Sequence, residues 1–228
     1  MISVIIPTLN ESASIHALVT TCFHYAKDEV EVIVCDGGSV DDTVRLAKLA
    51  GAQVLLCERK GRASQMNAGA QIAKGDVFYF VHADVKIHSD YEQDLYTAVK
   101  EGYALGCYRF RFDSNRLLLK INAFFTRFDF IWCRGGDQTL FMTKECYNTL
   151  GGFRSDFLIM EDYDLIVRAQ QTFPFKIIPK PVIVSARKYE NNGYFRVQWA
   201  NLTIMRMWKK GASQREMADT YRKLLDYR

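Results

Sequence analysis

Short apolar segments and helix-periodic segments alternate through the first eighty residues of the chain. Four apolar segments are predicted to be buried strands: Val4–Thr8, Val30–Cys35, Gln53–Cys57 and Val77–Val81. Between them, apolar residues recur three and four apart, as in Ile15, Leu18, Val19 and Cys22, which is the period of an amphipathic helix. Strands joined by helices of this length need right-handed crossovers and form parallel sheets covered on both faces. This region is therefore predicted to be a Rossmann-like parallel sheet.

The pattern changes in the second part of the chain. Tyr108, Phe110 and Phe112 alternate with arginines, which indicates a strand with one wet face. Further on, helices are predicted over 117–128 and 162–171, a strand over 139–143, and a pair of strands, separated by prolines, over 175–185. The spacing Ser-x-x-Asp or Ser-x-x-Glu predicts capped helix starts at Ser39, Ser89 and Ser213.

These elements predict an α/β fold in one domain over residues 1–228. We expect a parallel half over about residues 1–88, which binds the nucleotide, joined around one continuous sheet to a mixed half over about residues 89–228. The chain has 228 residues, and 49% of them are apolar, which is enough to bury one good-sized core.

Charge and cysteine usage narrow the class of protein. The 30 basic residues exceed the 26 acidic ones by too little to imply nucleic acid, although the mild excess could favour phosphorylated ligands or an anionic membrane surface. Six cysteines without a Cys-x-x-Cys spacing suit a reducing cytoplasm. No basic leader opens the chain, and no stretch reaches the roughly 18 apolar residues of a membrane span. A cytoplasmic protein, soluble or peripheral on the inner membrane face, is expected.

Three acidic clusters lie beside predicted buried segments. Asp36-Gly37-Gly38-Ser39-Val40-Asp41-Asp42 follows the second strand, His82-Ala83-Asp84 follows the fourth, and Glu161-Asp162-Tyr163-Asp164 precedes an amphipathic segment. Open α/β sheets bind ligands at the carboxyl ends of their strands, where helix and loop junctions leave a crevice. The clusters therefore predict a nucleotide and metal site.

An ordered set of motifs resembles a known family. The set comprises Pro7-Thr8-Leu9-Asn10-Glu11, Asp36-Gly37-Gly38-Ser39, Asn67-x-Gly69, His82-Ala83-Asp84, Gly151-Gly152-Phe153 and Glu161-Asp162. In this order and spacing, which covers nearly the whole chain, it resembles the family 2 glycosyltransferases, inverting enzymes with the GT-A fold that use nucleotide diphosphate sugars. Gly136-Asp137-Gln138 and Ser185-Ala186-Arg187 also resemble a small bacterial subgroup of this family whose acceptors are poorly defined.

The resemblance implies where the donor binds. It assigns Asp36 to the base, usually uracil, so a UDP-sugar is the expected donor; a turn or helix-capping role is the alternative. Arg62 and Asn67 would meet the diphosphate or ribose near a helix start. The pocket would also be lined by Pro7, Thr8, Asn10, Glu11 and Gly38, of which Asn10 could equally be a helix cap.

Chemistry suggests a metal beside the donor. Departure of a nucleoside diphosphate leaves about two negative charges, which a divalent cation held by a carboxylate would stabilise. Asp84 is the predicted ligand of Mn²⁺ or Mg²⁺. The family signature Asp-x-Asp has an aspartate where this chain has His82, which would ligate a softer ion such as Mn²⁺, contact the ribose or phosphate, or merely pack.

An inverting transfer needs one general base for the acceptor hydroxyl. The resemblance assigns this base to Asp162, with Glu161 beside it at the substrate, although acids in a first helical turn also suit the helix dipole. Asp137 is assigned to the acceptor, a sugar or a lipid-linked molecule. Arg187 belongs either to a loop that closes over the diphosphate or to a solvated surface. The implied reaction is a hexosyl transfer in cell envelope polysaccharide synthesis.

Two further features leave alternatives open. Trp132 and Phe124, Phe125 and Phe128 could form an acceptor or membrane-facing surface, but stripes at helical spacing are more often core. Besides glycosyl transfer, the sequence allows a nucleotidyltransferase, which usually carries a Gly-rich basic loop after the first strand, where this chain has Pro-Thr-Leu-Asn-Glu. A protein that binds a nucleotide without catalysis is the third function considered.

Overall fold

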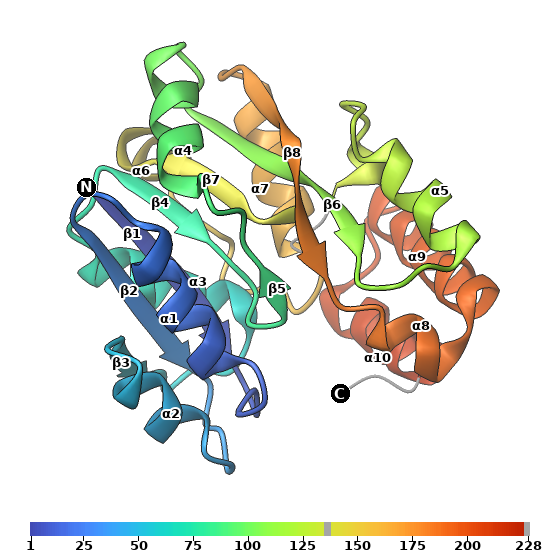
Figure 1. Ribbon diagram of the computed structural model, residues 1–228. Coiled ribbons are helices and arrows are strands. Elements are labelled where there is room, and N and C mark those ends of the chain that lie inside the picture. Colours follow the sequence, from blue (N-terminus) through green and yellow to red (C-terminus); the bar gives the residue numbers. More distant parts are fainter. Residues whose placement is uncertain (135–137, 226–228) are drawn as a thin grey trace.

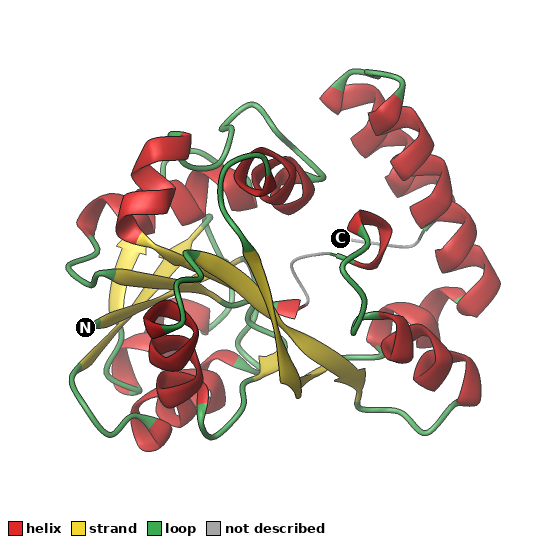
Figure 2. Ribbon diagram, turned by 90° about the horizontal axis from the view of Figure 1, so that it is seen from above, coloured by secondary structure: helices red, strands yellow, loops and turns green. Residues whose placement is uncertain are grey.

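The computed structural model describes residues 1–134 and 138–225, whose strands form one mixed sheet. The strand order is β3-β2-β1-β4-β7-β6-β8-β5 (Figure 1). Helices lie on both sides of the curved sheet, and the C-terminal helices gather away from the N-terminus (Figure 2). The strands are β1 (Ile2–Thr8), β2 (Val30–Asp36), β3 (Gln53–Leu56), β4 (Val77–Phe80), β5 (Val85–Lys86), β6 (Leu105–Phe112), β7 (Leu140–Thr143) and β8 (Phe175–Val184). The α-helices are α1 (Ile15–Tyr25), α2 (Thr43–Leu49), α3 (Arg62–Ile72), α4 (Tyr91–Lys100), α5 (Leu117–Phe125), α6 (Lys144–Leu150), α7 (Glu161–Gln170), α8 (Arg187–Asn192), α9 (Tyr194–Lys209) and α10 (Gln214–Leu224).

Strands β1 to β4 form the predicted parallel half. β1 pairs in parallel with β2 and with β4, and β3 extends the sheet beyond β2. Side chains of β1 alternate between two cores, because Val4 shares a buried cluster with Leu18 of α1, whereas Ile5 shares another with Met66 of α3. The prediction of a parallel sheet covered on both faces is confirmed.

The second half of the sheet is mixed. β7 is antiparallel to β4 and β6, and β6 is parallel to β8. The pair of strands predicted over 175–185 is wrong, because one strand, β8, runs through both prolines. Its register with β6 passes directly from Ile178 to Pro181, so Pro179 and Lys180 fall in a bulge. A bulge accommodates proline, which has no N–H to donate to the ladder.

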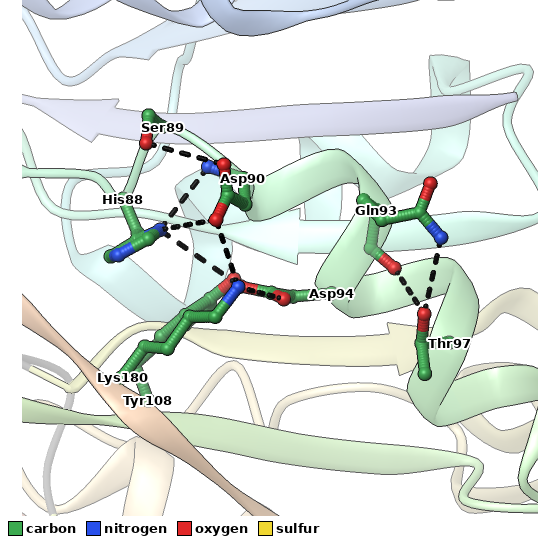
Figure 3. Close-up of polar contacts among 8 residues, drawn as sticks. All are labelled: His88, Ser89, Asp90, Gln93, Asp94, Thr97, Tyr108 and Lys180. Atoms are coloured by element: carbon green, nitrogen blue, oxygen red, sulfur yellow. Dashed lines mark hydrogen bonds and ion pairs between the residues drawn. The ribbon is translucent and has the colours of Figure 1, made fainter.

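An ionic cluster fastens α4 to this bulge (Figure 3). Lys180 Nζ lies 2.9 Å from a carboxylate oxygen of Asp90 and 2.6 Å from one of Asp94. The Tyr108 hydroxyl donates to Asp94 at 2.9 Å, and His88 Nδ1 accepts the Asp90 N–H at 3.1 Å. Hydrogen bonds to Asp94 and Asp90 raise the pKa of Lys180, which keeps this cation charged. The cluster thus fastens α4 to the mixed half of the sheet.

One of the three predicted helix caps is confirmed. The Ser213 hydroxyl accepts the Glu216 N–H at 3.2 Å at the start of α10. The caps at Ser39 and Ser89 are wrong, because α2 begins at Thr43 and α4 at Tyr91 without a side-chain cap. At both places the side chains have partners elsewhere: Ser39 bonds to Asp36, and Glu92 accepts backbone N–H groups of the loop after α1.

The apolar stripe of α5 faces outward and is not core. Phe124, Phe125 and Phe128 are exposed by 47%, 39% and 39%, and Leu119 is the one fully buried residue of this described helix. No helix within residues 1–134 and 138–225 has both the length and the hydropathy to cross a bilayer.

Candidate functional site

Asp36 closes the turn after β2 with both carboxylate oxygens. One oxygen accepts the N–H groups of Gly38 and Ser39 at 3.0 and 2.8 Å, and the other accepts the hydroxyls of Thr8, at 3.0 Å, and Ser39. The side chain is 1% exposed, and four donors fill the roughly four lone-pair positions of a carboxylate. Gly38 has a φ of 95°, which favours glycine. Asp36 therefore has the turn role, and its contact with a base stays a prediction.

The loop after β1 is bonded to the loop after β2. The Asn10 N–H donates to the Ser39 hydroxyl at 2.8 Å, and Asn10 Oδ1 accepts the Val40 N–H at 2.9 Å. The Glu11 N–H donates to Thr43 Oγ1 at 2.8 Å. Asn10 thus bridges two loops instead of capping a helix. The two predicted donor loops, one after the buried Pro7 and Thr8 of β1 and the other after β2, therefore form one unit.

Asp41 fixes these loops at their exposed edge. Its carboxylate accepts the N–H groups of Ser12 and Thr43 at 3.2 and 3.0 Å, and also the Thr43 hydroxyl. Hydrogen bonding, chiefly from the Thr43 hydroxyl, lowers the pKa of Asp41 to about 2. The ionised form of Asp41 is therefore the form that holds the loops.

Gln65 joins the ends of β1 and β2 from α3. Its Nε2 donates to the carbonyl oxygens of Thr8 and Cys35 at 2.8 and 2.7 Å. A Cβ at Gly37 would lie 3.0 Å from this nitrogen, so the close approach explains the glycine. Gln65 is absent from the sequence-based predictions, because one polar residue inside a helical segment leaves no periodic signal.

Arg187 connects the C-terminal half to the turn after β4. It begins α8, and its guanidinium lies 3.6 Å from the Asp84 carboxylate and 3.9 Å from that of Glu11. The side chains of Arg187 and Asp84 are 51% and 38% exposed, so a ligand can reach both. Three predicted site segments therefore meet at the carboxyl end of the sheet.

The segment His82-Ala83-Asp84 makes the turn between β4 and β5. His82 is 8% exposed, and its carbonyl accepts the Val85 N–H at 3.1 Å. Among the described residues, no three His, Cys, Asp or Glu side chains are grouped as a ready metal cage. A single accessible carboxylate still suits Mg²⁺, which proteins commonly hold through one or two carboxylates with substrate phosphates and water. The residues present thus fit the predicted ion, and ligation by Asp84 and His82 stays a prediction.

Three carboxylates lie buried in the first turn of α7. Glu161, Asp162 and Asp164 are exposed by 5%, 7% and 8%, and the positive end of the helix dipole favours acids there. Asp164 Oδ2 accepts from Arg168 Nε at 2.8 Å, and its other oxygen lies 3.6 Å from Arg154. Asp164 is therefore an ion-pair partner that supports the helix start.

An ion pair places this turn beside the donor loops. Arg62, the first residue of α3, lies 3.9 Å from the Glu161 carboxylate. The same helix carries Gln65, which holds the carboxyl ends of β1 and β2. The first turn of α7, with Asp162, therefore lies at the sheet edge that also carries Asp36.

Asn67, which was predicted to meet the diphosphate or ribose, holds a loop of the protein. Its Oδ1 accepts the Tyr147 hydroxyl at 2.5 Å and the Phe153 N–H at 3.0 Å. Its Nδ2 donates to the Phe153 carbonyl at 2.8 Å and to Ser155 Oγ at 3.1 Å. Asn67 thus ties α3 to the loop of Gly151-Gly152-Phe153, and contact with ribose or diphosphate would require these bonds to break.

Backbone strain adjoins the predicted site segments. Asn10, Thr139 and Met160 are the non-glycine residues with positive φ in the described chain, at 56°, 59° and 67°. Met160 directly precedes Glu161, and Asn10 lies in the donor loops. Such strain is concentrated at functional sites.

Asp137, the predicted acceptor residue, lies outside the described residues.

Comparison with known proteins identifies the family of this chain. The model of the family described as glycosyl transferase family 2 matches residues 3–158. A PGL/p-HBAD biosynthesis glycosyltransferase of Mycobacterium bovis is 26% identical over 191 residues, which cover 74% of this chain and 69% of the relative. An undecaprenyl-phosphate 4-deoxy-4-formamido-L-arabinose transferase of Aeromonas hydrophila is 34% identical over 113 residues, 45% of this chain and 35% of the relative.

Solved structures share the fold. Residues 1–349 of TarS from S. aureus, in complex with UDP-GlcNAc, superpose with a TM-score of 0.65 at 18% identity, over 81% of this chain and 58% of that chain. Glucosyl-3-phosphoglycerate synthase from Mycobacterium tuberculosis, with Mn²⁺, UDP and glucosyl-3-phosphoglycerate, gives 0.64 at 17% identity, over 100% and 81%. The chain thus spans somewhat more than half of the TarS structure, and the predicted GT-A fold is confirmed. The family model covers most of the chain, and on this ground the protein is a glycosyltransferase that belongs to glycosyl transferase family 2.

Proposed function

We propose that the protein moves a sugar from a nucleotide diphosphate sugar to a hydroxyl group of its acceptor, with inversion at the anomeric carbon. The observation that carries this proposal is the ion pair of Arg62 with Glu161. It supports a site in which the donor loops lie on one side and the first turn of α7, with Asp162, lies on the other.

The donor would bind at the carboxyl ends of β1 and β2. The turn of Asp36 and Gly38 and the loop of Asn10 and Glu11 are mutually bonded, so they would present a preorganised wall to the nucleotide. A UDP-sugar is the proposed donor, because the two structural neighbours were solved with UDP-GlcNAc and with UDP.

The leaving group would depart beside Asp84 and Arg187. A bound Mn²⁺ or Mg²⁺ would supply positive charge to the departing diphosphate, and Asp84 would hold it, with His82 as the second proposed ligand. The guanidinium of Arg187, 3.6 Å from Asp84, supplies a further positive charge and N–H donors that suit diphosphate oxygens. The presence of Mn²⁺ in the mycobacterial neighbour supports the assignment of the ion.

Asp162 would serve as the general base. Its carboxylate would take the proton of the acceptor hydroxyl as that oxygen forms a bond to the anomeric carbon. The bond from this carbon to the diphosphate oxygen would break at the same time, and its electron pair would leave with the diphosphate. Glu161 and Asp164 lie in the same helical turn and form ion pairs with Arg62 and Arg168, so they would have supporting roles.

The proposed acceptor is a sugar or a lipid-linked molecule, bound with the help of Asp137. Support comes from the names of relatives, one a PGL/p-HBAD biosynthesis glycosyltransferase and another an undecaprenyl-phosphate sugar transferase. The proposed reaction is a hexosyl transfer in the synthesis of cell envelope polysaccharide, on the cytoplasmic side of the membrane. Membership of the small bacterial subgroup with the Gly-Asp-Gln and Ser-Ala-Arg motifs belongs to the same proposal.

The experiment is a screen of UDP-sugars for nucleotide release, with and without Mn²⁺ or Mg²⁺ and with sugar and lipid-linked acceptors. Release of UDP that requires the acceptor and stops with chelator supports the proposal. Release of pyrophosphate would point to a nucleotidyltransferase, and tight UDP binding without turnover would point to a binding protein. Asp84→Asn should abolish release, whereas Asp219→Asn, at an exposed acid of α10, should leave it unchanged.

A further inference from the structure

Helix α5 leaves most of its apolar side chains exposed. Surface helices of folded proteins usually bury their apolar stripe. Along α5 and the following turn Leu119 is buried, but eight other apolar residues are exposed: Leu117 71%, Leu118 39%, Ile121 45%, Phe124 47%, Phe125 39%, Phe128 39%, Phe130 49% and Trp132 55%. We call these residues the α5 apolar face.

The aromatic side chains of this face form one continuous cluster. Phe124 contacts Phe128 edge to face, with ring centroids 5.9 Å apart, and Phe125 lies 5.9 Å from Trp132. Phe128 contacts Phe130, whose ring stacks on that of Trp132 at 5.4 Å. A contiguous exposed apolar surface of this kind marks an interaction site in a soluble protein.

A buried arginine holds the cluster in place. Arg134 is 4% exposed, and its guanidinium donates to the carbonyl oxygens of Thr126 and Phe128 at 3.3 and 2.6 Å. It also donates to Asp129 at 3.1 Å. Thr126 is itself buried and donates to the Ala123 carbonyl at 2.7 Å. The exposed aromatic rings are therefore carried by a fixed turn, so their exposure is a stable property of the fold.

Charge identifies what this face contacts. The segment from Arg116 to Trp132 contains the exposed basic residues Arg116, Lys120 and Arg127 and one acidic residue, Asp129, whose carboxylate is paired with the buried Arg134. Arg127 lies over the Phe124 ring, 3.7 Å from its centroid. Aromatic and aliphatic side chains bordered by basic ones are the composition of helices that lie in a membrane interface with anionic lipids. We propose that the α5 apolar face docks this protein on an anionic phospholipid bilayer.

The docking face has a defined relation to the proposed catalytic turn. Asp129, in the aromatic turn, accepts from Gln170 Nε2 at 3.1 Å, and Gln170 ends α7. The proposed base, Asp162, lies eight residues earlier on α7, about 12 Å along the helix axis at 1.5 Å per residue. A helix thus links the docked surface to the site. The docking itself goes beyond the proposed function, because it needs neither donor nor acceptor.

The test is sedimentation of the full chain with vesicles, without any sugar nucleotide. Phosphatidylcholine vesicles are compared with vesicles that also contain phosphatidylglycerol. The protein should sediment with the anionic vesicles and far less with the neutral ones. Phe124→Ser with Trp132→Ser should abolish sedimentation, and Arg116→Gln with Lys120→Gln should weaken anionic binding about fivefold per side chain.

A matched control separates docking from a general loss of surface hydrophobicity. Leu49→Ser with Leu56→Ser removes two side chains, each 65% exposed, on α2 and β3, and should leave vesicle binding unchanged. Equal binding of the wild type and the Phe124→Ser, Trp132→Ser variant would overturn the proposal, as would no binding to either kind of vesicle. A dimer in sedimentation velocity that this variant dissociates, without vesicle binding by the wild type, would assign the face to a second copy of the chain. None of these results depends on transfer activity.

Discussion

The contact between Gly37 and Gln65 gives a quantitative prediction about the donor loops. A Cβ at residue 37 would lie 3.0, 3.2 and 3.4 Å from three atoms of the Gln65 side-chain amide. The clash in Gly37→Ala is with a side chain fixed by two hydrogen bonds, which resists displacement. Overpacking of this kind costs about 1 to 3 kcal/mol of unfolding free energy.

Gly37→Ala should cost almost no unfolding free energy when the Gln65 side chain is also truncated. Gln65→Ala removes two hydrogen bonds of about 1 kcal/mol each, so it should lower the unfolding free energy by about 2 kcal/mol. In that background Gly37→Ala has no amide to meet and should cost less than about 0.5 kcal/mol. The two substitutions are therefore expected to be non-additive by at least about 0.5 kcal/mol.

Urea denaturation of the wild type, both single variants and the double variant measures this coupling. Midpoints multiplied by a common slope give the four free energies. Gln93→Ala on α4, a helix remote from the β1–β2 loops, controls for the loss of a glutamine and should change the free energy by less than about 0.5 kcal/mol. Additive effects of Gly37→Ala and Gln65→Ala would refute the reasoning, because they would show that the loop is not held by this amide.

Three further predictions concern the loops and the site. Asn67→Ala removes four hydrogen bonds and should lower the unfolding free energy by about 3 kcal/mol. Asn148→Ala, at an exposed position of α6, is the control and should leave the unfolding free energy unchanged. Equal urea midpoints for the two variants would contradict this prediction. The pKa of Asp41 is lowered to about 2 in the folded protein, so its contribution to stability is complete above about pH 4 and is lost as the pH falls through 2. The urea midpoint of the wild type should therefore fall between about pH 4 and about pH 2, and that of Asp41→Asn should fall less over the same range. An equal fall in both proteins would argue against the loop bonds of Asp41. Arg187→Gln should raise the KM for the donor about tenfold with little change in stability, because its ion pairs are exposed; an unchanged KM would remove Arg187 from the donor site.

The parallel half could be predicted because its signal is local. The strand over 77–81 is a continuous apolar run, and the helix that follows the first strand has its own apolar period, so both can be recognised from neighbouring residues. The bulge in β8 could not be predicted in this way. Pro179 and Pro181 read as a break, because the sequence alone does not show that β6 pairs on both sides of them.

The polar partners were harder to predict than the strands. Ser39 has the spacing of a helix cap, yet its hydroxyl bonds to Asp36, three residues earlier in the turn after β2. Asn67 lies in a family motif, but its partners at 153 and 155 become visible only in three dimensions. The stripe on α5 has the period of a core helix, and period alone does not say which face is covered.

The candidate site was predicted in its parts and not in its connections. Asp84, Arg187 and Glu11 were each predicted from a different motif. The ion pairs of Arg187 join them in space, although Glu11 and Arg187 are 176 residues apart in the sequence. Gln65 and Arg134, which hold the loops around the site and the aromatic turn, belong to no motif. Residues that position other residues leave little trace in a single sequence, because their identity is set by contacts between distant segments.

The central claim is that Asp162 takes the proton of the acceptor hydroxyl. The most direct test is to measure kcat for sugar transfer, together with the affinity for UDP, in the variant Asp162→Asn. The account predicts a fall in kcat of at least about a hundredfold, the scale of general base catalysis, while the affinity for UDP stays the same. Asp219→Asn should have wild-type values for both quantities. Wild-type turnover in Asp162→Asn would contradict the claim, as would a loss of UDP affinity that accounts for the whole effect.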